Sequence, residues 1–184
     1  FWDNASSSMV SLAEHLGTPV LTTSKCKGAI IEDHPLRAGC IIGGLIERDL
    51  VSKSDLIVTV GLDAVELQPK GWPYPTKVLS LASHPSLDGL IACDEEVVGN
   101  LDSILKILRT IVPKGNDWGL DAAKNFRTRV HRALDTPSTG LSPQHAVEIS
   151  RTILPRDTIA TCDAGASRLL VVQKWQCFAC EMFK

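Results

Sequence analysis

Leu56-Ile57-Val58-Thr59-Val60, followed by Gly61, is the segment that decides the fold class of this chain. Its side chains are apolar except for one threonine, and β-branched residues dominate. A strand with one solvent-exposed face alternates polar and apolar residues, whereas a strand buried on both faces is continuously apolar. Parallel strands covered by helices are of the second kind, so the segment predicts a parallel sheet.

Strand and helix patterns alternate on both sides of this run. We expect further strands at 20–23, 77–81, 96–98 and 158–162. Helices are expected at 5–16, 44–53, from 101 to a stop at Pro113, at 118–134, from 143 to an end at Pro155, and up to 175. Asn100 can cap the helix at 101–111, and Ser142-Pro143 is a typical helix start. On the helix at 143–153, Ala146, Ile149 and Ile153 mark the expected apolar face.

This alternation predicts an α/β fold: a three-layer, Rossmann-like parallel sheet with helices on both faces, followed by the opening elements of a second α/β domain. Three units are expected, with residues 1–113 forming the first domain, 114–140 a helical linker and 141–184 the start of the second domain. No internal repeat accompanies them.

Composition excludes several classes of protein. The chain has 184 residues, 44% of them hydrophobic, and a formal net charge of -2. Such a chain has enough apolar surface to fold, and without a basic excess it is not a dedicated nucleic-acid binder. No apolar run approaches the roughly 20 residues that span a bilayer, so we expect no membrane partner. The N-terminal residues lack the features of a signal peptide.

The cysteines bear on the compartment of the protein. They are few for the length of the chain and mostly lie in or beside apolar segments: Cys26, Cys40, Cys93, Cys162, Cys177 and Cys180. We interpret them as reduced, buried thiols of a cytoplasmic protein. The alternative is that Cys177-x-x-Cys180 is a redox pair or half of a zinc site, although no second Cys/His pair stands at zinc spacing.

Two turns could hold a ligand. Asp163-Ala164-Gly165-Ala166-Ser167 lies between an expected strand and a helix, where free helix amides and a small residue let a phosphate approach. A plain structural turn would look the same. The loop from Gly61 to Glu66 follows the central strand, so Asp63 and Glu66 could accept hydrogen bonds from ribose hydroxyls, or could simply be solvated.

The residue pattern assigns no catalytic residue and no metal ligand. His34 and His84 each precede a proline, and neither has a carboxylate or cysteine neighbour at ligand spacing, so loop shaping is their expected role. No nucleophile elbow, Walker A loop or complete G-x-G-x-x-G fingerprint is present.

Several segments together resemble a known family. They are LAEHLGTPVLTT at 12–23, Lys27-Gly28 with EDHPL at 32–36 and Gly39, SDLIVTVGLD at 54–63, and VVG at 97–99 before a leucine-rich helix. Their order and spacing resemble the central domain of thiamine-diphosphate-dependent enzymes of the acetolactate synthase type. The likeness covers most of residues 5 to 112. The family's central domain opens with a strand and a glycine-rich turn, and this chain begins inside the following helix.

The second unit resembles the start of the family's diphosphate-binding domain. The resemblance implies that the backbone of Ala164, Gly165, Ala166 and Ser167 contacts the coenzyme diphosphate. Synthase-type members commonly have Gln-His where this chain has Ala166-Ser167, which removes those side-chain contacts. Ala82-Ser83-His84-Pro85 stands where FAD- or ADP-binding members carry acidic residues, and this argues against either nucleotide.

The resemblance therefore implies a fragment of a homo-oligomeric enzyme, a decarboxylase (lyase) or carboligase (transferase) that acts on a 2-oxo acid with thiamine diphosphate and magnesium. The family's activating glutamate and magnesium motif lie outside these residues, so we expect the fragment alone to be inactive. Whether the fragment itself counts as an enzyme stays open. The alternatives are a non-catalytic scaffold and a nucleotide-binding module of the same fold. A missing opening strand would expose a sheet edge and favour self-association.

Overall fold

The strands form two parallel sheets. The computed structural model describes residues 5–66, 72, 74–85, 93–135, 137–180 and 182–183. In one sheet, β1 (Val20–Thr22) pairs with β2 (Arg37–Cys40), and in the other the order is β3 (Leu56–Val60), β4 (Lys77–Ala82), β5 (Glu95–Val98). Every neighbouring pair is parallel, which confirms the predicted α/β fold.

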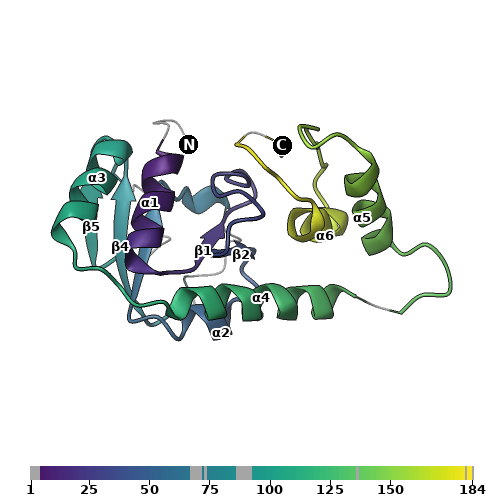
Figure 1. Ribbon diagram of the computed structural model, residues 1–184, viewed down its shortest axis with the longest axis horizontal. Coiled ribbons are helices and arrows are strands. Elements are labelled where there is room, and N and C mark those ends of the chain that lie inside the picture. The colour runs from purple at the N-terminus through teal and green to yellow at the C-terminus, as the bar shows by residue number, and fades with distance from the viewer. Residues whose placement is uncertain are drawn as a thin grey trace.

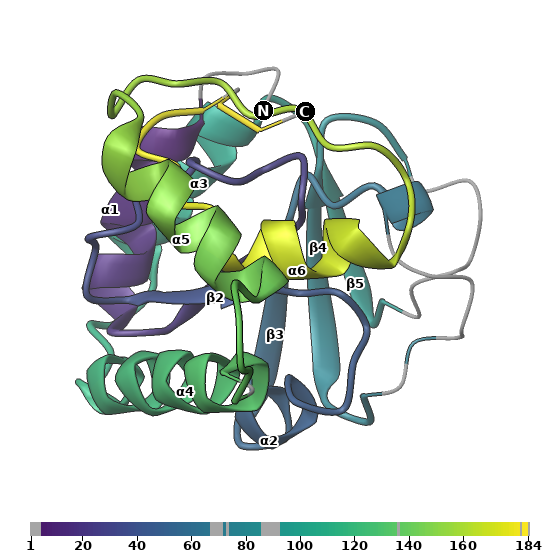
Figure 2. The same ribbon diagram turned by 90° about the vertical axis from the view of Figure 1, so that its right-hand side faces the viewer.

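Helices surround these sheets (Figure 1). They are α1 (Ser6–Leu16), α2 (Arg48–Val51), α3 (Leu101–Ile111), α4 (Trp118–Leu134), α5 (Pro143–Ile153) and α6 (Ala166–Lys174), with a 3-10 turn η1 at Ala64–Glu66. Figure 1 places α1 and α3 at one end of the molecule and α5 and α6 at the other, with α4 extending between them. In Figure 2, α5 and α6 lie side by side in front of the sheets, in agreement with their mutual contacts.

Helix caps confirm the predicted starts of two helices. The Asn100 side chain accepts a hydrogen bond from the Ser103 amide at 3.0 Å, and the Ser142 hydroxyl accepts one from the His145 amide at 3.2 Å. Each cap satisfies an amide that has no partner inside its helix. None of the helices in the described ranges combines the length and the hydropathy that crossing a bilayer requires.

The N-terminal core lies between α1, α3 and the three-stranded sheet. Leu12 of α1, Leu105 of α3 and Leu81 of β4 are buried in one apolar cluster. Gly17 ends α1 with a φ of 60°, and a Cβ at this position would lie 1.8 Å from the Asn116 carbonyl oxygen. Only glycine therefore lets the segment before α4 pack against the end of α1.

Strand β3 is less buried than its sequence predicts. Its partner β4 buries Val78 and Leu81 almost completely, whereas the Leu56 side chain on β3 is 46% exposed. The reason is its position, because β3 is the edge of its sheet and pairs only with β4 among the described residues.

Three predicted elements need correction. Residues 158–162 form no strand, because only Ala160 pairs, in a single bridge to Phe183. The helix expected at 44–53 is reduced to α2, since the buried Glu47 carboxylate accepts a hydrogen bond from the Ile42 amide at 2.7 Å and holds the preceding loop. Strand β2 was not predicted, because Arg-Ala-Gly-Cys has no strand pattern and pairing with β1 decides its conformation.

The buried face of α5 also differs from the prediction. Ile153 is 75% exposed and Ile149 49%, whereas Arg151 is buried. The Arg151 guanidinium lies 4.9 Å from the centre of the Trp175 ring and donates to the Leu154 carbonyl at 3.1 Å. An arginine with an aromatic partner and backbone acceptors thus occupies the face where apolar residues were expected.

Candidate functional site

Three segments that are distant in sequence meet at the carboxyl ends of the parallel strands. The loop after β1 contacts the loop after β3, since Lys25 bonds Glu66 through its amide (3.3 Å) and its ammonium group (3.6 Å). The first turn of α6 joins them, because the Arg168 guanidinium donates to the Ser24 hydroxyl at 3.0 Å. Ligands of open α/β sheets bind at this edge, so this is the candidate site.

The turn before α6 presents backbone donors. The Asp163 carboxylate accepts a hydrogen bond from the Ala164 amide at 2.7 Å, and Gly165 has a φ of 144°, which favours glycine. A Cβ at Gly165 would meet only the Ser167 hydroxyl, at 3.9 Å, so the backbone there is open to an approaching group. The amides of Ala166 and Ser167 begin α6 and have no acceptor within the helix, which suits an anion.

The two acidic residues after β3 are already engaged. Asp63 Oδ1 accepts a hydrogen bond from the Val65 amide at 3.0 Å, and both Glu66 oxygens face Lys25. Asp63 thus shapes its own loop, and Glu66 links that loop to the one after β1. His34 likewise holds its own loop, because its Nδ1 lies 3.2 Å from the Leu36 amide that donates to it.

Metal ligands do not gather in the described ranges, where no three His, Cys, Asp or Glu side chains come together in a geometry that could hold an ion.

A buried ion network lies beneath the β1 loop. Glu32 Oε1 accepts from the Lys27 ammonium at 3.0 Å, and Glu32 Oε2 lies 2.7 Å from the Arg37 guanidinium. The Lys27 side chain is only 1% exposed. Sequence reasoning did not find this network, because Lys27 and Glu32 entered only as parts of a family-like motif and nothing local showed that they are buried together.

Glu32 also ties the first unit to the second. Its amide donates to the Cys177 carbonyl at 3.2 Å, and the Cys177 amide donates back to Glu32 Oε1 at 3.3 Å. Glu32 thus joins Lys27 of the loop between β1 and β2, and Arg37 at the start of β2, to the segment after α6. Because the same loop leads back to β1, the network sets how α6 sits against the candidate site.

The thiols are free, and two of the six are buried. Burial raises the pKa of the Cys177 thiol to about 11 and also raises the pKa of the Cys26 thiol. Cys180 is exposed and donates to the Gly28 carbonyl at 3.7 Å. A buried thiol with a raised pKa is a poor nucleophile, so the geometry does not favour Cys177 and Cys180 as a redox pair.

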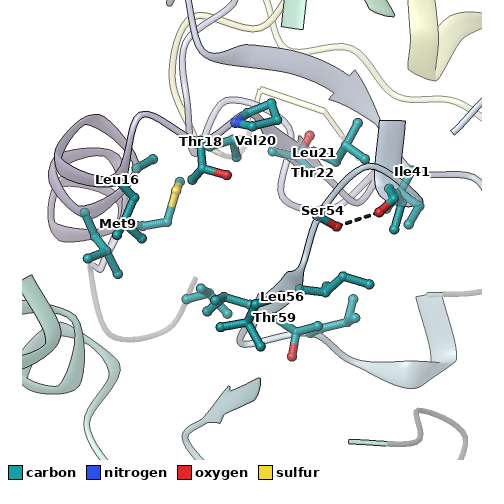
Figure 3. A pocket seen from close by; sticks show the side chains of 18 of the residues that line it. Met9, Leu16, Thr18, Val20, Leu21, Thr22, Ile41, Ser54, Leu56 and Thr59 are labelled. Atoms are coloured by element: carbon teal, nitrogen blue, oxygen red, sulfur yellow. Dashed lines mark hydrogen bonds between the residues drawn. The ribbon is translucent and has the colours of Figure 1, made fainter. Parts of the chain in front are cut away.

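A cavity of about 540 Å³ separates the two sheets (Figure 3). Val20, Leu21 and Thr22 of β1 line one side, and Leu56 and Thr59 of β3 line the side that faces them. Side chains of α1, including Met9 and Leu16, close a third side. The lining is mainly apolar, and sequence analysis gave no signal for it beyond the expected loss of a strand.

Comparison with known proteins gives a consistent result. Residues 1–108 match the family described as "Thiamine pyrophosphate enzyme, central domain". Two probable acetolactate synthase large subunits, from Methanocaldococcus jannaschii and Methanococcus aeolicus, are each 24% identical over 90% of this chain. The chain spans about a third of the length of these curated relatives, 31% and 32%.

Solved structures share the fold. Benzoylformate decarboxylase from Polynucleobacter necessarius aligns over 98% of this chain and 35% of its own, with a TM-score of 0.73 and 19% identity. A putative thiamin diphosphate-dependent enzyme from Mycobacterium smegmatis aligns over 98% of this chain and 36% of its own, with a TM-score of 0.71 and 20% identity. The fold of these enzymes therefore includes both the sheets and the helices α5 and α6 of this chain.

The Glu32 network makes a testable contribution to stability. Glu32→Ala leaves Lys27 and Arg37 buried without their carboxylate, so we expect the free energy of unfolding to fall by about 3–5 kcal/mol in urea titrations. Asp33→Ala is the matched control, because its pair with Arg156 is exposed on both sides and should be worth about 0–1 kcal/mol. Equal effects of the two substitutions would contradict a special role for Glu32.

Cys177 should make stability depend on alkaline pH. Its pKa rises on folding from 9.0 to about 11, so the folded state favours the neutral thiol. This contribution is complete below pH 9 and is lost as the pH rises through 11. We expect the free energy of unfolding to decline across this interval more steeply in the natural chain than in Cys177→Ala. Cys180→Ala, at an exposed thiol, should keep the steep decline, and an identical decline in all three chains would disprove the assignment.

Proposed function

Because this chain belongs to the thiamine pyrophosphate enzyme central-domain family, we propose that it forms the central domain and the start of the diphosphate-binding domain of an acetolactate synthase-like enzyme. In this proposal, residues 1–113 are the central domain, 114–140 a helical linker and 141–184 the opening of the diphosphate-binding domain. The match at 1–108 supports the first unit, and the fold shared over 98% of the chain supports the presence of the others.

The first turn of α6 is the observation that carries the proposed cofactor site. Its open backbone at Gly165 and its free amides at Ala166 and Ser167 fit a diphosphate group, and the Ser167 hydroxyl adds a donor. Ala164 offers only its backbone, and its amide already donates to the Asp163 carboxylate, so a diphosphate would have to compete with that hydrogen bond. When bound, thiamine diphosphate supplies the stabilisation of a carbanion, and this chain supplies the anchor and its orientation.

The remainder of the proposal concerns the whole protein. It would act on a 2-oxo acid as a decarboxylase or carboligase, with magnesium bound by residues outside the described ranges. It would form a homo-oligomer in the cytoplasm. Two pairs of exposed apolar side chains, Ile107 with Ile111 on α3 and Ile149 with Ile153 on α5, support association, because residues four positions apart lie on one face of a helix that a partner could cover.

A scaffold role is the second candidate. Asp63 and Glu66, the residues that could have accepted ribose hydroxyls, are bonded to Val65 and Lys25. A nucleotide at the loops after β1 and β3 would have to displace these contacts. The central domain would then position its neighbours through packing and bind no nucleotide itself.

Pyrophosphate can test the diphosphate site directly. We expect inorganic pyrophosphate to shift the amide NMR signals of 164–168 in this chain. Ala166→Pro deletes the first amide donor of α6 at a position where helices accept proline, so affinity should fall by about tenfold or more. Ser6→Pro makes the same change at the start of α1 and should leave the affinity unchanged. Signals that move equally across the chain, or not at all, would reject the site.

Turnover should be absent in the purified chain. With pyruvate, thiamine diphosphate and Mg²⁺, we expect no release of carbon dioxide above the protein-free rate, because the proposal places the activating carboxylate and the magnesium ligands elsewhere. Carbon dioxide release that scales with the concentration of this chain would overturn that placement, even if pyrophosphate binds as expected.

A further inference from the structure

A second cavity, of about 360 Å³, lies between β2, α4 and the helix pair α5 and α6. Figure 2 shows α5 and α6 in front of β2, with α4 below them, and both α4 and α6 contact β2. Charged and amide side chains dominate the wall of this cavity, in contrast to the apolar cavity between the two sheets. None of the residues of the turn at 163–167 belongs to it, so it is separate from the proposed diphosphate site.

The wall of this cavity has an excess of positive charge. Its cations are Arg37 of β2, Arg127 of α4, Arg151 of α5 and Lys174 of α6, and its carboxylates are Glu32 and Glu148. Glu32 pairs with Arg37 at 2.7 Å, and Glu148 accepts a hydrogen bond from Lys174. Neither Arg127 nor Arg151 pairs with a carboxylate in the described part of the chain. Two positive charges therefore face the cavity without a counter-charge.

The Arg151 guanidinium is held in place with one of its nitrogens unused. Arg151 is 8% exposed, and its Nη2 donates to the Leu154 carbonyl at 3.1 Å and to the Pro155 carbonyl. The Trp175 ring covers the guanidinium. The Nη1 atom is buried and has no acceptor among the residues that the structure describes. A buried N–H of a cation is costly without an acceptor, so an anion in the cavity would gain this hydrogen bond at little cost in ordering.

Arg127 is oriented by neutral acceptors only. Its Nη1 donates to the Pro35 carbonyl at 3.1 Å and to the Arg37 carbonyl. Burial lowers the pKa of the Arg127 guanidinium, and the neighbouring Arg37 cation lowers this pKa further. The surroundings thus disfavour the charge that Arg127 carries, and a bound anion would reverse that effect.

We propose that this cavity binds a small organic dianion, a dicarboxylate or a phosphate monoester, with Arg127 and Arg151 as its anchors. Two negative charges match the two guanidinium groups that lack a carboxylate, and the planar guanidinium fork suits the oxygens of either headgroup. A volume of about 360 Å³ is in the range of small-molecule sites and admits more than a bare inorganic ion. The ligand would contact β2, α4 and α5 at once.

Titration with succinate and with glycerol 3-phosphate, followed by NMR, tests the proposal. Saturable shifts are expected at the Gly39 amide, which lines the cavity, and at the Nε–H signals of Arg127 and Arg151. Arg127→Gln removes one anchor and should weaken binding by about tenfold or more. Arg129→Gln is the matched control, because it removes the same charge from the opposite face of α4, where Arg129 pairs with Asp49 at 2.7 Å. Its affinity for either probe should equal that of the unchanged chain.

Further arms of the titration separate the outcomes. Tighter binding of one probe identifies the headgroup, and succinamide, an uncharged analogue of succinate, should cause no shift. The proposal is overturned if neither dianion gives saturable shifts, if succinamide gives the same shifts, or if both arginine variants lose equal affinity. Signals at 164–168 report the proposed diphosphate site, so either site can fail without the other.

A second variant applies if Arg127→Gln does not fold. Glu148 is 38% exposed in its side chain and pairs with Lys174, so Glu148→Gln adds one uncompensated positive charge to the cavity. Succinate should then bind about fivefold more tightly. Unchanged or weaker binding of succinate to Glu148→Gln would contradict an electrostatic site for a dianion.

Discussion

The carboxylate of Glu32 is the interaction on which the arrangement of the two units depends. It neutralises Lys27 and Arg37, both buried, and it accepts the amide of Cys177. Without this carboxylate, burying the two cations would cost more free energy than their packing contributes. The loop between β1 and β2 could then not keep its conformation. The segment after α6 would lose its anchor together with that loop. One side chain in the first unit thus contributes to holding α6 over the sheet edge, together with the packing of Val172 and Trp175 on Cys40.

Parallel strand geometry supplies the second constraint. Strands pair in parallel within each sheet, so the loop that follows β1 and the loop that follows β3 each leave at the carboxyl end of their own sheet. The Lys25–Glu66 pair then closes one loop on the other, and Arg168 attaches the helix start to Ser24. Each of these contacts is weak and partly exposed. They position the candidate site but contribute little to the free energy of folding. The site is therefore placed by topology and fixed by the buried network below it.

Local sequence was sufficient where an element is stabilised by its own pattern. The apolar run of β3, the spacing and Asn100 cap of α3, and the Ser142-Pro143 start of α5 each specify structure without distant partners. The residue pattern predicted the wrong structure where contacts with distant parts of the chain determine whether a strand forms. Residues 158–162 have strand-forming side chains but pair only through Ala160, while β2 has none of the expected residues and pairs along its length.

The candidate site, too, could be predicted only in part from the sequence. The turn at 163–167 could be found from sequence because a small, polar segment before a helix has a recognisable composition. The contacts that place it could not, since Arg168 and Ser24 are 144 residues apart and Lys25 and Glu66 are 41 apart. The engagement of Asp63 with Val65 and of Glu66 with Lys25 is likewise invisible in sequence. The sequence thus identified the turn that could bind an anion, and only the folded structure shows which residues surround that turn.

The residue types of β3 and the burial of β3 do not agree. Natural sequences tend to agree at every level, so that residue type, pattern and burial point to the same structure. β3 has the composition of a strand covered on all sides, yet Leu56 is 46% exposed and the strand borders an apolar cavity. The neighbouring helix α1 also turns apolar residues to that cavity, but Met9 and Leu12 are buried there. The edge position of β3 accounts for this exposure, because no strand among the described residues pairs with the side of β3 that faces the cavity.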